Sequence, residues 1–281
     1  MITGWQYKPR ATLLQRLDPR ARLAFYFCFL FSVFMFWDVR VLAGFLALTI
    51  VVIRCAGLSW RETGRAWLLV LGFTSFYGLV TLFTGQVGRQ FYQTEHVIAS
   101  WQAPLTLFGW QPVISISTER IYLALSQFAR VVDIAAMTVL IPYTFDPALY
   151  GITFRRLGLP DKLAFALDLT MRFVPSLGRD FAMTMDAQKA RGYELERREG
   201  GLLGQVRKLA PLLVPVIIHS IINGEEITDA MDLRAFGTRP RTWLRDLRFA
   251  PRDYAVVALS FTMLAVSAGA SLLGYGRFWT P

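Results

Sequence analysis

Five runs of apolar residues, spread along most of the chain, constrain its fold more than any other feature of the sequence. Of the 281 residues, 54% are hydrophobic and only 18% are charged, a balance typical of membrane proteins. Backbone groups exposed to lipid have to be hydrogen-bonded within their own segment, so each run is expected to be a helix. The runs are Leu23–Trp37, Val41–Ile53, Ala66–Thr84, Glu119–Ile141 and Tyr254–Leu273.

The predicted fold class is therefore all-α, a polytopic membrane protein with about five transmembrane helices. The first two runs are short for a bilayer, but Arg22, Arg40 and Arg54 stand at their ends. Long cationic side chains at helix ends can reach the polar interface, which makes short spans acceptable.

The basic residues predict the orientation of these spans. Of the 30 Lys and Arg residues, 25 lie before the first run, between the second and third, or within 142–253. Only three lie in the other connections, one of which is 85–118. Because cytoplasmic segments carry the excess of Lys and Arg, the N-terminus and 142–253 are expected in the cytoplasm. Segment 85–118 is then an outer loop, lying in the interface or forming a short re-entrant turn.

The region between the fourth and fifth runs is too apolar for a loop and too charged to span the bilayer. From Asp161 to Asp186 the charges fall on one stripe of a helix whose other faces are apolar, the pattern of an amphipathic helix. The chain is thus divided into four N-terminal spans (1–141), a cytoplasmic or interfacial domain of long amphipathic helices (142–249) and a C-terminal span (250–281).

A second amphipathic helix is expected from Gln205 to about Phe236. Its first half, Leu209–Ile222, is apolar enough to span, to dip into the bilayer or to lie in the interface, and the pattern leaves these three alternatives open. Broad exposed apolar surface usually marks a partner site. We therefore expect the apolar faces of both helices to dock another membrane subunit, through Phe173, Leu177, Leu213 and Ile217.

Several function classes are excluded by what the sequence lacks. There is no G-x-x-x-x-G-K-[ST] loop, so the chain is not expected to hydrolyse ATP or to be an enzyme of that kind. Two isolated histidines and two cysteines without metal spacing predict neither catalytic residues, nor a metal site, nor a cofactor. The net charge of +10 would suggest nucleic acid in a soluble protein, but beside apolar runs it indicates cytoplasmic arginine, and no nucleic-acid partner is expected.

The two amphipathic helices end in a repeated signature: alanine, arginine four residues later, a small residue, then an aromatic one. Ala and Arg spaced by four share a helical face, where the small side chain lets another surface approach and arginine offers a planar group for a carboxylate. The alternative is that both arginines are solvated or bind lipid phosphates. The candidate coupling residues are Ala187, Ala190, Arg191 and Gly192 in the first copy, and Ala230, Arg234 and Ala235 in the second.

Further short motifs accompany these signatures along nearly the whole chain. They are Leu17–Arg22 (LDPRAR), Thr144–Pro147 (TFDP), Leu157–Pro160 (LGLP), Arg172–Pro175 (RFVP) and Arg239–Thr242 (RPRT). Together with Ala187–Gly192 (AQKARG) and Ala230–Phe236 (AMDLRAF), they resemble the motifs of one family. This is the transmembrane T component of energy-coupling factor transporters, the family of EcfT, CbiQ and BioN.

The second signature departs from the family pattern A-M-E-A-R-G-[FY]. Leu233 replaces the usual alanine and Ala235 the usual glycine, whereas Arg234 is retained. Glycine ends helices in the left-handed conformation, so Gly237 is the candidate for that role here. Because its motif is intact, Arg191 is expected to matter more than Arg234.

The resemblance implies a defined role. The chain would be a multi-pass protein of a prokaryotic plasma membrane that joins two ATP-binding-cassette ATPases to one small substrate-binding membrane subunit. The arginine-bearing helix ends would sit in grooves of the ATPases, so that ATP-driven motion reaches the binding subunit and releases a vitamin or metal ion inside. The ATPase activity would reside in the partners.

Three other functions are compatible with a polytopic helical chain. A permease subunit of a conventional ATP-binding-cassette importer usually has one cytoplasmic E-A-A-x-x-x-G loop and polar spans, neither of which is present here. A membrane enzyme would need clustered carboxylates or histidines. A non-catalytic membrane scaffold would not bind ATPases, so co-purification with ATPases separates it from a coupling subunit.

Four charged residues outside the signatures have expected roles. Arg130 and Asp133 lie inside the fourth run, spaced by three. They are expected to form an internal salt bridge, and the alternative is a charged pair on the coupling or partner-facing surface. Arg155 and Arg156 are expected to contact lipid phosphates rather than to form a ligand site.

Overall fold

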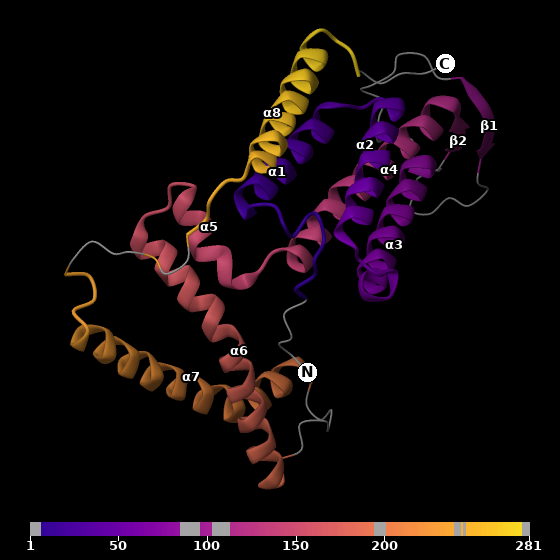
Figure 1. Ribbon diagram of the computed structural model, residues 1–281. Helices are drawn as coiled ribbons and strands as arrows, with labels where there is room; N and C mark the ends of the chain where they lie inside the picture. Colours follow the sequence, from indigo (N-terminus) through magenta and orange to yellow (C-terminus); the bar gives the residue numbers. More distant parts are fainter. Residues whose placement is uncertain are drawn as a thin grey trace. The chain divides into compact units, whose positions relative to one another are not determined.

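The computed structural model describes residues 7–84, 96–102, 113–193, 201–238, 243 and 246–276. Within these residues the chain is almost entirely helical (Figure 1). It divides into two compact units. We call residues 6–146 and 248–281 the membrane unit, and residues 147–247, which are inserted into it, the inserted unit.

The membrane unit is built from the five predicted spans, all of which are confirmed as helices. Each extends a few residues beyond at least one end of its apolar run, because polar caps and charged first turns continue the helix. α1 packs against α8, and α2 and α3 both pack against α4 (Figure 1). The helices are α1 (Pro19–Met35), α2 (Val39–Ala56), α3 (Trp60–Thr84), α4 (Thr118–Thr144) and α8 (Pro251–Leu272).

Four helical segments of the described residues are long and apolar enough to cross a bilayer. Three are the predicted spans α2, α4 and α8, and the fourth is Leu209–Leu233, which contains the segment predicted to span, dip or lie in the interface. α1 has 17 residues, which is short for a span, as its apolar run indicated.

The core of the membrane unit is aromatic and aliphatic. Tyr26, Phe29 and Leu42 from α1 and α2 are buried together with Met137 and Leu140 from α4. The outward face of α1 carries exposed phenylalanines, Phe27, Phe31 and Phe34. A helix that is apolar on its exposed face suits contact with lipid rather than water.

Segment 85–118, predicted to be an outer loop, contains an antiparallel strand pair that was not predicted. β1 (Val97–Gln102) pairs with β2 (Val113–Ser117), and residues 103–112 between them lie outside the described residues. Glu119 in the first turn of α4 accepts hydrogen bonds from the backbone nitrogen of His96 at 3.1 Å and from its Nδ1 at 2.8 Å. This pair ties the start of the ribbon to the start of α4.

The predicted salt bridge between Arg130 and Asp133 is wrong. Asp133 accepts a hydrogen bond from the Thr49 hydroxyl of α2 at 2.8 Å, and its other carboxylate oxygen has no partner. Arg130 instead donates to the backbone carbonyl of Phe36 and lies over the Trp37 ring, 3.9 Å from its centroid. Helix α2 and the α1–α2 connection supply closer partners than the residue three positions away on the same helix.

The inserted unit consists of η1 (Pro147–Leu149), α5 (Tyr150–Arg156) and the two long helices α6 (Asp161–Ala190) and α7 (Gly201–Leu233). Both predicted amphipathic helices are thus confirmed. α6 packs against α5 and α7. At Gly151 in α5, a Cβ atom would lie 2.7 Å from the Ala164 carbonyl oxygen and 2.7 Å from Asp168 Cβ, so only glycine permits this approach.

Candidate partner-binding site

The two signature ends have the same backbone geometry. In α6, Gly192 adopts a φ of 83°, its nitrogen bonds to the Lys189 carbonyl at 2.9 Å, and the Tyr193 nitrogen bonds to the Gln188 carbonyl at 3.0 Å. This pair of bonds is the Schellman motif, in which a left-handed residue closes a helix and satisfies its last carbonyls. The motif places Arg191 at the end of the helix axis, with its side chain leaving the last turn.

α7 closes in the same way without glycine. Ala235 takes the left-handed conformation with a φ of 55°, its nitrogen bonds to the Asp232 carbonyl at 2.9 Å, and the Phe236 nitrogen bonds to the Met231 carbonyl at 3.0 Å. The expectation that Gly237 caps this helix is therefore wrong, although Gly237 also has a positive φ of 88°. A left-handed alanine is strained relative to glycine, so the motif is formed here at a cost in stability.

All seven predicted coupling residues are exposed. They are Ala187, Ala190, Arg191 and Gly192 at the end of α6, and Ala230, Arg234 and Ala235 at the end of α7. The side chains of both arginines have no hydrogen bond or ion pair with any residue that the structure describes. An exposed, unpaired guanidinium at a helix end is available to a carboxylate or phosphate.

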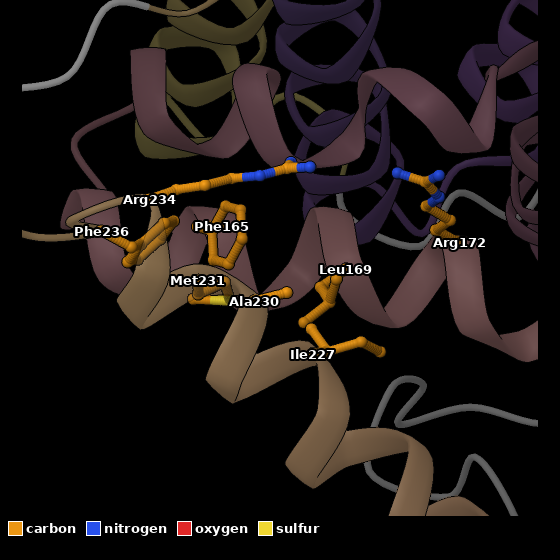
Figure 2. Close-up of a pocket in the computed structure, with 8 residues that line it drawn as sticks. All are labelled: Phe165, Leu169, Arg172, Ile227, Ala230, Met231, Arg234 and Phe236. Atoms are coloured by element: carbon orange, nitrogen blue, oxygen red, sulfur yellow. The ribbon is translucent and has the colours of Figure 1, made fainter.

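Arg234 borders a hollow of about 360 Å³ between α6 and α7 (Figure 2). Its walls are mostly apolar. At one side, the ring centroids of Phe165 and Phe236 lie 4.6 Å apart. Arg172 from α6 borders the same hollow, and Figure 2 shows its guanidinium and that of Arg234 extending toward one another above the apolar side chains. The lining residues are Phe165, Leu169, Arg172, Ile227, Ala230, Met231, Arg234 and Phe236.

Arg172 is a site residue that sequence reasoning missed. Like Arg234, it has no side-chain partner among the described residues. Two like charges beside a low-polarity surface repel each other, so an anion between them would be favoured. The signal was present in the Arg172–Pro175 motif, but only the packing of α6 on α7 brings Arg172 to the second signature.

The four predicted docking residues are at least partly accessible. Phe173 is half-buried, while Leu177 on α6 and Leu213 and Ile217 on α7 are exposed. α7 carries further exposed aliphatic side chains around these positions: Val214, Ile218, Ile221 and Ile222. Exposed apolar area of this extent is rare on a protein surface that meets only water.

Two other predictions concern the start of the inserted unit and metal sites. Arg155 and Arg156 form ion pairs with Asp161 and Asp246. Their expected contact with lipid phosphates stays a prediction. No cluster of three metal-ligating side chains occurs in the described part of the chain. The Arg239–Thr242 motif lies outside the described residues.

Comparison with known proteins places these features in context. The family model described as cobalt transport protein, CbiQ, matches residues 10–243. Among curated proteins, the chain is 30% identical over 266 residues to a protein of Lactococcus lactis, covering 92% of each chain. It is 26% identical to a Staphylococcus aureus protein (94% and 93% covered) and 28% identical to one from Thermosediminibacter oceani (95% and 96%). All three relatives are named energy-coupling factor transporter transmembrane protein EcfT.

Proposed function

We propose a coupling role for this chain, which belongs to the cobalt transport protein family. Its two exposed arginine-bearing helix ends bind two partner ATPases and are moved by them. The chain is the transmembrane component of an energy-coupling factor transporter and acts in the membrane. The chain itself is not an enzyme. The single observation that supports the proposed coupling role is that both long helices end in the same left-handed turn, each with an exposed arginine that has no side-chain partner among the described residues.

The partners follow from the chemistry of these ends. A guanidinium without an internal counter-charge fits a carboxylate in a groove, where two parallel hydrogen bonds form. Two such ends suit two ATPase subunits, one for each helix. When the ATPases close on ATP, α6 and α7 shift, and a small substrate-binding subunit that carries a vitamin or metal ion reorients in the membrane.

The helix ends at Arg191 and Arg234 differ in the binding surface that they offer to an ATPase. At Arg234 the hollow with Arg172 would accept an apolar side chain next to a carboxylate, the carboxylate lying between the two guanidinium groups. Two donors and a buried apolar contact bind more strongly than one exposed ion pair. From this geometry we expect Arg234 to bind an ATPase at least as strongly as Arg191, whereas the intact motif alone favours Arg191, and the two single variants below decide between these predictions.

Charge reversal at the two arginines tests the proposal. Loss of one side of a partly desolvated ion pair costs about 2–5 kcal/mol, on the order of 30- to several-thousand-fold in affinity. Arg191→Glu and Arg234→Glu should each weaken capture of the ATPases by the purified chain, and the double variant should capture none. Lys at either position should restore only part of the binding, because a point charge lacks the planar pair of donors.

The matched control is Arg179→Glu, since Arg179 is an exposed arginine of α6 outside both signatures. Its ATPase capture should equal that of the wild type. Full capture by the double Glu variant would refute the coupling role. Attraction to anionic lipid, in contrast, would treat Lys and Arg alike and leave the complex assembled.

The substrate-binding subunit is expected on the apolar surface of α6 and α7. Charged substitutions at Phe173 or Leu213 should release that subunit while the ATPases stay attached. Retention of the subunit by both variants would contradict this surface.

The proposed orientation has the N-terminus and the inserted unit in the cytoplasm. Cysteine introduced at Met183 of α6 should react with a membrane-impermeant reagent only from the cytoplasmic side. Cysteine at His96 should react only from outside. The reverse pattern would overturn the orientation.

A further inference from the structure

Within the described residues, the chain crosses between the inserted unit and the membrane unit at residues 146–147 and 247–248. Displacement of the inserted unit can therefore reach the membrane unit through these two crossings. On the membrane-unit side, both crossings are held by one short segment, Asp18–Arg22 at the start of α1. We call Asp18, Arg20 and Arg22 the α1 clamp.

The first crossing is held by Arg22. Its Nη1 donates to the backbone carbonyl of Thr144 at 2.6 Å, and its guanidinium lies 5.3 Å from the centroid of the Phe145 ring. The Tyr26 hydroxyl, one turn further along α1, lies 3.3 Å from the Thr144 hydroxyl oxygen. These groups are buried. The end of α4 is thus fixed to α1 two residues before the chain leaves the membrane unit.

The second crossing is held by Asp18 and Arg20. The Asp18 backbone nitrogen donates to Asp253 Oδ1 at 2.9 Å, and Asp253 Oδ2 accepts from the Ala250 nitrogen at 2.8 Å. Arg20 pairs with the Asp18 carboxylate at 3.1 Å and lies over the Phe249 ring, 4.0 Å from its centroid. The first residues after the return of the chain, and the start of α8, are therefore fixed to the same turn of α1.

This arrangement gives a structural reason for two motifs that the coupling arginines do not explain. LDPRAR and TFDP are more than 120 residues apart in the sequence, yet Arg22 of the first bonds to Thr144 of the second. Buried, charge-assisted hydrogen bonds in a low-dielectric environment are stiff and costly to break. Both crossings therefore resist independent movement at their membrane-side ends.

We infer that the α1 clamp transmits displacement of the inserted unit to the membrane helices, because it joins the end of α4 and the start of α8 to α1, and the far ends of these helices shift when the inserted unit moves. The inference rests on the proposed function, which supplies the displacement. Arg22 and Asp253 are positioning residues, since neither is assigned to a partner. Without the clamp, the two crossings would be as flexible as loops. The inserted unit would then move while the membrane helices stayed in place.

The experiment uses the chain assembled with its ATPases and two pairs of spin labels, with Cys28 and Cys55 replaced. One pair, at Met183 and Leu233, reports on the ends of α6 and α7. The other, at Leu79 and Leu273, reports on α3 against α8. All four positions are exposed. Pulsed electron resonance measures the change of each distance between the nucleotide-free and the ATP-trapped complex.

The wild type should show an ATP-dependent change at both pairs. Arg22→Gln and Asp253→Asn should keep the change between α6 and α7 and lose the change between α3 and α8. The glutamine cannot reach and stack as arginine does, and asparagine offers one acceptor oxygen where Asp253 uses two. Arg22→Lys, which keeps one donor for the Thr144 carbonyl, should restore part of the lost change.

Two control variants separate transmission from general damage. Arg130 is also buried, donates to a backbone carbonyl and lies over an aromatic ring, but it contacts the α1–α2 connection rather than a crossing. Glu119 is a carboxylate that accepts a backbone bond from a preceding segment, at the outer ribbon. Arg130→Gln and Glu119→Gln should therefore retain both distance changes.

The outcomes are distinguishable. An intact change between α3 and α8 in Arg22→Gln and Asp253→Asn would overturn the clamp, and so would its equal loss in the two controls. Absence of any change between α6 and α7 in the wild type would instead refute the proposed function on which the clamp depends.

Discussion

Arginines of the membrane unit and of the inserted unit have opposite surroundings. Arg22 and Arg130 are buried, and each donates to a backbone carbonyl and lies over an aromatic ring. Arg172 and Arg234 are exposed and have no side-chain partner among the described residues. The same residue type thus stabilises the fold in one unit and remains available for a partner in the other.

The difference extends to packing. The membrane unit has a contiguous apolar core, whereas α6 and α7 together bury only Ala164 and Leu212 among the side chains described. A pair of long helices with so little shared core would gain further stability from a bound partner. Variants in the two units should therefore fail in different assays.

The largest expected effect is on stability, at Arg22. Arg22→Ala leaves the buried Thr144 carbonyl without its charged donor, which costs about 2–3 kcal/mol. Arg234→Ala removes a side chain without internal partners and should change stability by no more than about 0.5 kcal/mol. Thermal unfolding of the purified chain in detergent measures both. Equal losses would remove the distinction between the two units.

The next effect tests whether the inserted unit has any fixed packing of its own. Gly151→Ala pushes a methyl group against Ala164 and Asp168, and overpacking of this kind costs about 1–3 kcal/mol. The hydrogen-exchange rates of the backbone amides in α5 and α6 should rise in this variant. The matched control is Gly44→Ala in α2, where a Cβ meets nothing within 4 Å and the helix should gain about 0.5–1 kcal/mol.

A smaller effect is expected at the two Schellman turns. Ala235→Gly relieves a left-handed alanine and should stabilise the end of α7 by about 1 kcal/mol, whereas Gly192→Ala should destabilise the end of α6 by a similar amount. Hydrogen exchange of the last-turn amides measures both. Opposite signs are required, and a destabilising Ala235→Gly would mean that this turn is not strained.

The smallest effect is electrostatic and depends on pH. Glu62 lies in the first turn of α3, before the apolar run, and hydrogen bonds from Lys8 and Arg10 lower its pKa from 4.5 to about 2. The carboxylate therefore contributes stability above pH 4.5 that is lost as pH falls through about 2. The stability difference between wild type and Glu62→Gln should shrink over that interval, and should be smaller at high salt because the site is solvent-screened. A pH-independent difference would contradict this ion pair.

The spans and the two amphipathic helices could be predicted because their signals are local. A bilayer permits only segments that form their own backbone hydrogen bonds. Apolar runs such as Leu23–Trp37 and Tyr254–Leu273 are therefore expected to be helices. The β1–β2 ribbon could not be predicted, since two short strands flanking a loop rich in Trp and Pro lack a periodicity that distinguishes them from a turn.

Residue roles were predicted less well where partners come from other elements. Arg130 and Asp133 share a helical face, but Thr49 and the Phe36 carbonyl lie closer. Gly237 looked like the cap of α7, but hydrogen bonding to the last carbonyls selects the residue directly after Arg234, even though it is alanine.

The sequence by itself determined the helices, their apolar faces and the arginine at the end of each long helix, because these depend on spacing within one segment and on the absence of water in lipid. Only the tertiary structure decided which arginines are buried beside backbone carbonyls and which have no side-chain partner among the described residues. It alone brought Arg172 beside Arg234, and Arg22 to Thr144. Contacts between elements depend on how helices pack in three dimensions, and residue spacing along the chain carries no record of that.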